Sequence, residues 1–210
     1  MKRDELKKAI DYYRAKVKEE MAGEKKINGQ FIGPRNPTRK MDLEDIIHPK
    51  RPFLSKDVEN DVDSIYVTTF RFGTLKKPVS MVKCGYGTDL VGGMEFGSQL
   101  VQKGFIKSVK DLAPVFVKYK LGILDIFMEK DLNNGKKMDI MVYECIECGG
   151  LPNIGEPVCY FETGIITGIL KELTHKEVFA EEVRCWASGY SFCHFSVEIN
   201  HDPEGSLESQ

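Results

Sequence analysis

The chain has 210 residues, of which 41% are apolar and 30% are charged, and its formal net charge is −2. These proportions are those of an ordinary globular protein, and the near-neutral charge argues against nucleic acid as a partner. The N-terminus lacks an apolar signal segment, and no apolar run reaches the roughly 18–20 residues that span a bilayer. We therefore expect a cytoplasmic protein without membrane insertion.

An amphipathic helix is predicted over residues 2–21, where charges fill the faces between the apolar positions. The apolar side chains recur at steps of three and four, at Leu6, Ile10, Tyr13, Val17 and Met21. Such a stripe predicts a surface that packs on another helix, either within the chain or across a homodimer.

An irregular arm is predicted over residues 24–56, which are rich in Gly, Pro and Asn, with one helical turn near Leu43–Ile47. Residues 1–60 carry 15 Lys/Arg against 11 Asp/Glu, and residues 25–56 carry eight basic and three acidic side chains. A basic arm could contact an anionic partner, but we interpret this one as a solvated linker.

Pairs of strands alternate with helices in the rest of the chain. Two strands are predicted over Ser64–Phe72 and Val79–Cys84, because β-branched and aromatic residues recur in the first of them. Further elements are predicted as helices at 88–103, 108–120 and 156–173 and as strands at 123–129, 138–145, 178–185 and 192–199. This order predicts an α+β domain with an antiparallel sheet. We place the domain at 61–200, between the N-terminal segment 1–60 and a disordered tail at 201–210.

Glycines interrupt two of the predicted helices. Gly92, Gly93 and Gly97 lie within 88–103, so this segment either packs closely on a neighbour or is not fully helical. Gly164 and Gly168, four residues apart, allow the helix at 156–173 to approach the sheet closely.

Five of the six cysteines fall in the last third of the chain, at Cys145, Cys148, Cys159, Cys185 and Cys193. In a reducing cytoplasm, clustered thiols are more often metal ligands than disulfides. Buried free thiols, which are common core residues, are the other alternative. An iron–sulfur cluster usually draws on denser thiolate spacing, so we favour zinc.

Three of these thiols are expected to meet. Strand alternation places Cys185 with Val183, and Cys193 with Phe195, on apolar faces of the last hairpin. Cys159 follows a proline and lies in the first turn of the predicted helix 156–173. The three thiols therefore provide three of the four ligands of a tetrahedral zinc site.

The fourth ligand is open between several residues. An extended backbone puts Cys145 and Glu147 on one face and Cys148 on the other, and a loop can override that order. His194 is the least favoured, since it alternates away from the neighbouring thiol. We favour Cys148, so the predicted set is Cys148, Cys159, Cys185 and Cys193, with Cys145 or Glu147 as the alternative fourth ligand.

Three segments resemble the 4-vinyl-reductase domain, in the archaeal form known as hydrocarbon-binding proteins. They are Glu144–Pro152 (ECIECGGLP), Pro157–Gly164 (PVCYFETG) and Glu182–Phe195 (EVRCWASGYSFCHF). The resemblance covers about 140–199 and extends from about 65. It implies an α+β fold shared with haem-NO-binding and vesicle-tethering small-subunit proteins, and an interior pocket for small hydrophobic molecules.

The resemblance also implies a ligand set. In bacterial regulators that sense aromatic hydrocarbons, the domain dimerises and holds zinc with one Glu and three Cys. By motif, the cysteines correspond to Cys159, Cys185 and Cys193, and the glutamate to Glu147. The chain departs from this pattern because two further cysteines, at 145 and 148, flank Glu147.

The expected function is therefore the binding of a small hydrophobic or aromatic molecule, as a sensor or carrier, by a zinc-stabilised homodimer. The predicted pocket lies between the helices around 88–120 and the sheet, lined by Phe96, Val115, Phe116, Tyr119, Phe161 and Ile165. The alternative is a subunit or accessory factor of a vinyl reductase or tetrapyrrole-processing enzyme. No residue is assigned a catalytic role, and no Gly-x-Gly-x-x-Gly motif supports a nicotinamide site.

Overall fold

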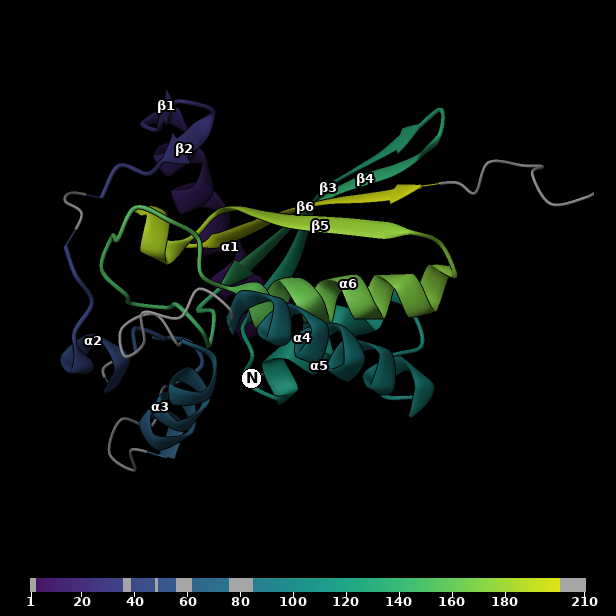
Figure 1. Cartoon of the computed structure of the whole chain (residues 1–210), viewed down its shortest axis with the longest axis horizontal. Helices are drawn as coiled ribbons and strands as arrows, with labels where there is room; N and C mark the ends of the chain where they lie inside the picture. Colours follow the sequence, from purple (N-terminus) through teal and green to yellow (C-terminus); the bar gives the residue numbers. More distant parts are fainter. Residues whose placement is uncertain (1–2, 36–38, 48, 56–61, 76–84, 201–210) are drawn as a thin grey trace, which may run out of the picture.

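The computed structural model describes residues 3–35, 39–47, 49–55, 62–75 and 85–200. Its centre is a four-stranded antiparallel sheet with the strand order β3-β4-β6-β5 (Figure 1). The strands are β3 (Ile123–Leu132), β4 (Gly135–Tyr143), β5 (Val178–Arg184) and β6 (Cys193–Asn200). An antiparallel sheet with packed helices is the predicted α+β class, and both predicted hairpins are confirmed.

The pairing of the strands brings distant segments to one end of the sheet. Val142, near the end of β4, pairs with Cys193 at the start of β6. Arg184, the last residue of β5, pairs with His194. The segments that follow β4 and β5 therefore leave the sheet at the same end, where β6 begins.

Helices and loops cover both faces of the sheet. Since side chains alternate along a strand, successive residues of β4 point to opposite faces. Ile140 and Val142 belong to a core with α4 (Gly85–Gln102), α5 (Leu112–Lys118) and α6 (Tyr160–Thr174). Met141 and Tyr143 belong to a second core with α1 (Arg3–Ala22).

The N-terminal helix α1 confirms the helix predicted at 2–21, but it packs differently from the prediction. Its buried residues are Ala9, Tyr13 and Val17. Tyr13 stacks on Tyr143 of β4, with ring centroids 4.8 Å apart and an interplanar angle of 11°. The apolar stripe therefore packs on the sheet of the same chain instead of on another helix.

Helices α4 and α6 lie side by side in contact between their backbones (Figure 1). A Cβ atom on Gly93 would stand 2.1 Å from the carbonyl oxygen of Phe161, and one on Gly168 would stand 2.1 Å from that of Met94. The predicted glycines of both helices thus serve one interface. Gly164 and Gly168 face α4, not the sheet as expected, and α4 is helical throughout.

The strand predicted at Ser64–Phe72 is wrong, because this segment lies within the helix α3 (Val62–Thr74). Its β-branched residues favour a strand locally, yet Val67 and Arg71, one helical turn apart, are both buried. Tertiary contacts of that helical face override the local propensity. The second strand predicted there, Val79–Cys84, lies outside the described residues.

The arm predicted as irregular contains more structure than expected. The helical turn at Leu43–Ile47 is confirmed as α2. A hairpin of β1 (Lys25–Ile27) and β2 (Gln30–Ile32) was not predicted. Its turn is Asn28–Gly29 with φ angles of 50° and 86°, which is the dipeptide and the conformation that a two-residue hairpin favours.

The remaining helices differ from the prediction at their ends. The segment predicted at 108–120 begins with a 3-10 turn, Val109–Asp111, and continues as α5. The backbone N–H of Ser108 donates to the Asp111 carboxylate at 2.9 Å, which caps this start. Helix α6 begins at Tyr160 rather than at 156.

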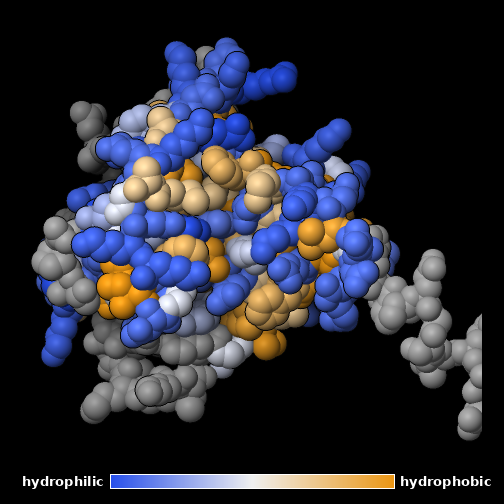
Figure 2. All heavy atoms as spheres, turned by 90° about the horizontal axis from the view of Figure 1, so that it is seen from above, coloured by the Kyte–Doolittle hydropathy of each residue, from blue (hydrophilic) through white to orange (hydrophobic). Residues whose placement is uncertain are grey.

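The surface combines charged and apolar residues. Seen from above, hydrophobic residues lie in several patches between charged ones (Figure 2). No helix within the described ranges is long and apolar enough to cross a membrane.

Candidate metal centre

Five cysteines converge where the two hairpins and the start of α6 meet. Cys145 and Cys148 lie in the loop after β4, and Cys159 is the residue that precedes α6. Cys185 follows β5, and Cys193 is the first residue of β6. All five are buried free thiols. Cys159 lies at the N-cap of the helix and not within its first turn, because α6 begins one residue later than Cys159.

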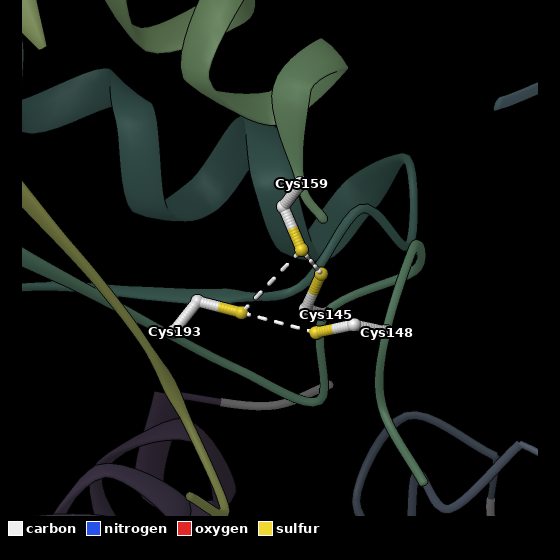
Figure 3. A group of neighbouring side chains, drawn as sticks. All are labelled: Cys145, Cys148, Cys159 and Cys193. Atoms are coloured by element: carbon white, nitrogen blue, oxygen red, sulfur yellow. Dashed lines mark hydrogen bonds between the residues drawn. The ribbon is translucent and has the colours of Figure 1, made fainter. Parts of the chain in front are cut away.

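The sulfur atoms lie within contact distance of one another. The Sγ atom of Cys159 is 3.5 Å from that of Cys145, 3.7 Å from that of Cys185 and 3.8 Å from that of Cys193. The Sγ atoms of Cys148 and Cys193 are 3.1 Å apart. In Figure 3 four of these side chains point their sulfur atoms toward a common centre. Around one zinc ion with bonds of about 2.3 Å, tetrahedral thiolates stand about 3.8 Å apart, so the cluster fits such an ion.

The donor atoms form two overlapping groups, in each of which they all lie within 4.8 Å of one another. The first group consists of Cys145, Cys148, Cys159 and Cys193. The second group consists of Cys159, Glu182, Cys185 and Cys193. Cys159 and Cys193 belong to both groups, whereas the predicted ligands Cys148 and Cys185 belong to different groups.

The predicted alternative ligand Glu147 lies on another side of the cluster. It forms a third group with Cys159 and Glu162. Its Oε2 atom accepts a 2.9 Å hydrogen bond from the backbone N–H of Glu162. The side chain of Glu162 in turn accepts a 2.9 Å hydrogen bond from the thiol of Cys145.

Glu182 is the donor that sequence reasoning missed. Strict alternation along β5 points its side chain away from Cys185, but the register of β5 against β6 shifts between Glu182 and Arg184. A β-bulge of this kind re-aims side chains, and the Glu182 carboxylate joins the cysteines. One signal was available, since the third family-like segment begins with this glutamate.

The carboxylate of Glu182 also fixes the approach of α6 to the cluster. Its Oε2 atom accepts hydrogen bonds from the backbone N–H of Cys159 at 2.9 Å and of Val158 at 3.1 Å. Its buried Oε1 atom, like the Oε1 atom of Glu162, has no hydrogen-bond partner within the described part of the chain. A buried carboxylate oxygen without a partner is costly, and a metal ion is one partner that fits.

Burial also determines the protonation of these donors. It raises the pKa of the Cys159 thiol and of the Glu182 carboxyl well above their ordinary values. Buried acids of this kind hold their protons until a cation replaces them, because metal ligands bind in deprotonated form. The arrangement is therefore suited to binding a cation with the release of protons.

Arg71 of α3 supports the loop that carries Cys145 and Cys148. The guanidinium is fully buried and donates hydrogen bonds to the backbone carbonyls of Ile146 at 2.9 Å and Gly149 at 2.7 Å. Planar guanidinium groups suit this bidentate contact. The loop conformation thus depends on a residue about 75 positions earlier in the chain.

Two arginines of the N-terminal arm act in the same way. Arg51 donates to the carbonyl of Glu144 at 2.9 Å and to that of Lys120. Arg35 donates to the carbonyl of Tyr190 at 2.9 Å and to that of Trp186, both in the turn before Cys193. Parts of the arm are therefore buried against the site, which corrects the interpretation of a solvated linker.

His194 takes part in a separate buried network. Its Nδ1 atom lies 2.8 Å from the Arg184 guanidinium, and its Nε2 atom lies 2.9 Å from the Asp139 carboxylate. Arg184 also forms a bidentate pair with Glu24 at 2.7 and 2.8 Å. Both ring nitrogens of His194 are therefore engaged away from the thiols.

The six predicted pocket residues lie in and around the helical core. Phe96 and Phe161 stack with centroids 6.0 Å apart, while Ile165, Val115 and Phe116 are buried. Tyr119 is partly buried against the same core.

A cavity of about 540 Å³ lies elsewhere, directly beside the cysteines. Its wall includes Phe31, Leu90, Pro157, Cys159, Tyr160 and Glu182. Among the described residues, the six predicted liners are not part of this wall. Cys159 and Glu182 therefore face both the cavity and the thiol cluster.

Comparison with known proteins gives one family match. Residues 138–199 match the model of the vinyl-4-reductase domain. The uncharacterized protein MJ1642 of Methanocaldococcus jannaschii is 34% identical over 104 residues, which cover 50% of this chain and 61% of MJ1642. The uncharacterized protein MJ0150 of the same organism is 28% identical over 160 residues, which cover 76% of this chain and 88% of MJ0150. The chain thus spans less than two thirds of MJ1642.

Three solved structures are similar to the chain. One is the phenol-responsive sensory domain of the transcription activator PoxR with phenol, at a TM-score of 0.48 and 10% identity over 89% of both chains. A vinyl-4-reductase family protein from M. jannaschii has a TM-score of 0.41 and 21% identity, over 75% of this chain and 91% of that one. Trafficking protein particle complex subunit 3 from Naegleria fowleri, covalently bound to palmitic acid, has a TM-score of 0.46 and 15% identity, over 69% and 96%.

Proposed function

Because residues 138–199 belong to the vinyl-4-reductase domain family, we propose that the protein binds a small hydrophobic molecule beside a structural zinc site, as a sensor or carrier. The observation that carries this proposal is the position of the cavity. Cys159 and Glu182 line it and also belong to the donor cluster. A ligand in the cavity would therefore contact the residues that hold the metal.

The proposed role of zinc is to tie separate segments together. The cysteines come from the loop after β4, the start of α6 and both ends of the β5–β6 turn. A structural zinc ion contributes directly to folding, by about 10–16 kcal/mol in small zinc peptides. At this position it would hold one end of the sheet and one wall of the cavity in place.

The cavity suits a small, largely apolar ligand. Its volume of about 540 Å³ falls within the roughly 300–1,000 Å³ of small-molecule sites. Phe31, Leu90 and Pro157 supply apolar wall, and Glu182 supplies a polar group at the metal end. We expect a compact aromatic or aliphatic ligand with one polar substituent.

Thermal-shift screening of the zinc-loaded protein with small aromatic and aliphatic compounds tests the binding. A ligand at 100 times its Kd should stabilise the protein by about 2.7 kcal/mol. Leu90→Trp, which fills the cavity wall, should abolish the shift, whereas Val91→Trp, at a neighbouring position that is 64% exposed, should keep it. Failure of every apolar compound to stabilise the protein would contradict the proposal.

We also propose that the chain forms a homodimer. Several large apolar side chains on α3 are exposed, among them Ile65, Tyr66 and Phe72 at 63%, 43% and 53%. Exposed apolar groups of this size often mark a protein interface. Sedimentation velocity should detect a dimer, and Phe72→Glu should shift it toward the monomer. A wild-type monomer at every concentration would contradict the proposal.

A further inference from the structure

The donor cluster contains more ligands than one tetrahedral ion uses. Its two four-donor groups together comprise six residues, of which Cys159 and Cys193 are shared. Two tetrahedra that share one edge need six donors, two of them bridging. We propose that the centre is binuclear and holds two zinc ions bridged by the thiolates of Cys159 and Cys193. This inference rests on the proposed zinc site and extends it.

The shared edge has the length that bridging requires. The Sγ atoms of Cys159 and Cys193 are 3.8 Å apart. Two thiolates on one tetrahedral zinc ion stand about 3.8 Å apart when the Zn–S bonds are about 2.3 Å. The same edge can serve a second ion on its other side, because a thiolate sulfur has lone pairs for two metals.

The four terminal donors lie in two pairs that come from different segments. The loop after β4 supplies Cys145 and Cys148, whose sulfur atoms are 3.5 Å from Cys159 and 3.1 Å from Cys193, respectively. The end of β5 supplies Glu182 and Cys185, and the Cys185 sulfur is 3.7 Å from that of Cys159. The bridging pair thus has one terminal pair from the β4 side and one from the β5 side.

The charge of the centre also favours two cations. Five thiolates and one carboxylate carry six negative charges. One divalent ion leaves four of them in a buried site, whereas two ions leave two. Uncompensated buried charge is costly. With a single ion, two of the buried donors would stay protonated and would not bind metal.

Metal content of the full-length protein tests the stoichiometry. The protein is purified without added metal, in the presence of a thiol reductant, and is measured by native mass spectrometry and elemental analysis. We expect about two zinc ions per chain. One ion per chain would overturn the inference and leave the proposed zinc site intact. No metal, or a mass lower by two protons from a disulfide, would overturn both.

Two reciprocal double variants act as matched controls for each other. Cys145→Ser with Cys148→Ser removes one terminal pair, and Glu182→Gln with Cys185→Ser removes the other. Each should retain about one zinc ion per chain, half of the wild-type content. Wild-type content in either double variant would contradict the assignment. Circular dichroism checks that each variant is folded before its metal is counted.

Cobalt substitution tests the bridge on the wild-type protein, without a variant. High-spin Co²⁺ has a strong paramagnetic resonance signal, and two such ions joined by thiolates couple magnetically. The signal per cobalt should therefore fall by about half or more when the second equivalent binds. A signal that simply doubles would show two separate ions and would overturn the bridge.

Discussion

The phenolic O–H of Tyr13 donates a 2.9 Å hydrogen bond to the carboxylate of Glu144, which lies 131 residues later in the chain. The same carboxylate accepts hydrogen bonds from the backbone N–H groups of Phe53 and Leu54 at 2.9 and 2.8 Å. Glu144 has a φ angle of 52°, which non-glycine residues adopt only with support. The N-terminal helix and arm thus stabilise the turn that leads directly into Cys145.

Removal of this hydrogen bond should destabilise the protein. We expect Tyr13→Phe to lower the free energy of unfolding by about 1–3 kcal/mol, because a buried charged acceptor loses its donor. Tyr12→Phe is the matched control, since Tyr12 is 48% exposed. Urea denaturation of both variants measures the difference. Equal stability of the two variants would contradict a structural role for the hydrogen bond.

The contact between α4 and α6 predicts opposite effects at two adjacent glycines. A Cβ on Gly93 would stand 2.1 Å from the Phe161 carbonyl oxygen, whereas one on Gly92 would meet its nearest neighbour at 3.8 Å. Gly93→Ala should therefore cost about 1–3 kcal/mol through overpacking. Gly92→Ala should stabilise the helix by up to about 1 kcal/mol. Thermal unfolding would refute this account if both variants shifted in the same direction.

The buried arginine on α3 predicts a link between the N-terminal half and metal retention. Arg71→Met would leave the carbonyls of Ile146 and Gly149 without their donor, at about 1–3 kcal/mol for each. We expect lower stability and faster loss of zinc to a chelator. Arg39→Met is the control, because Arg39 lies on the surface with Asp45 as its partner. Unchanged zinc loss in Arg71→Met would contradict the link.

Removal of the metal should loosen the site before the rest of the fold. Chelation should increase amide hydrogen exchange in 144–151 and 185–193, because these segments lose the ion that joins them. The backbone-packed helices α4 and α6 should exchange more slowly. Hydrogen exchange with and without chelator measures this, and uniform exchange across the chain would show that the metal controls global folding instead.

The cap before α5 predicts a dependence of stability on pH. The backbone N–H of Lys107 donates to the Asp111 carboxylate at 2.9 Å, and this hydrogen bond holds the pKa of Asp111 below its ordinary value. A lowered pKa in the folded state stabilises the protein above the ordinary value, about 3.9. This stabilisation is lost as the pH falls through the folded pKa. Asp111→Asn should therefore be less stable than wild type at pH 7, and the gap should close in acid.

Much of the local structure could be predicted because it depends on short-range periodicity. The apolar spacing of 2–21, the two hairpins and the antiparallel α+β class follow from backbone periods of 3.6 and 2 residues. The local pattern was misleading in α3, where a β-rich composition forms a helix whose buried face carries Val67 and Arg71. The dipeptide Asn28–Gly29 was a local signal for a hairpin that the sequence reasoning did not use.

The sequence by itself determined that five thiols are concentrated in one third of the chain and that strands carry them inward. Only the tertiary structure decided which donors share a group, since a β-bulge turns Glu182 toward Cys185. It also decided that Arg35, Arg51 and Arg71 hold the carbonyls of the site loops. Periodicity specifies which way a side chain faces along its own element. Contacts between residues about 75 or more positions apart depend on how those elements pack.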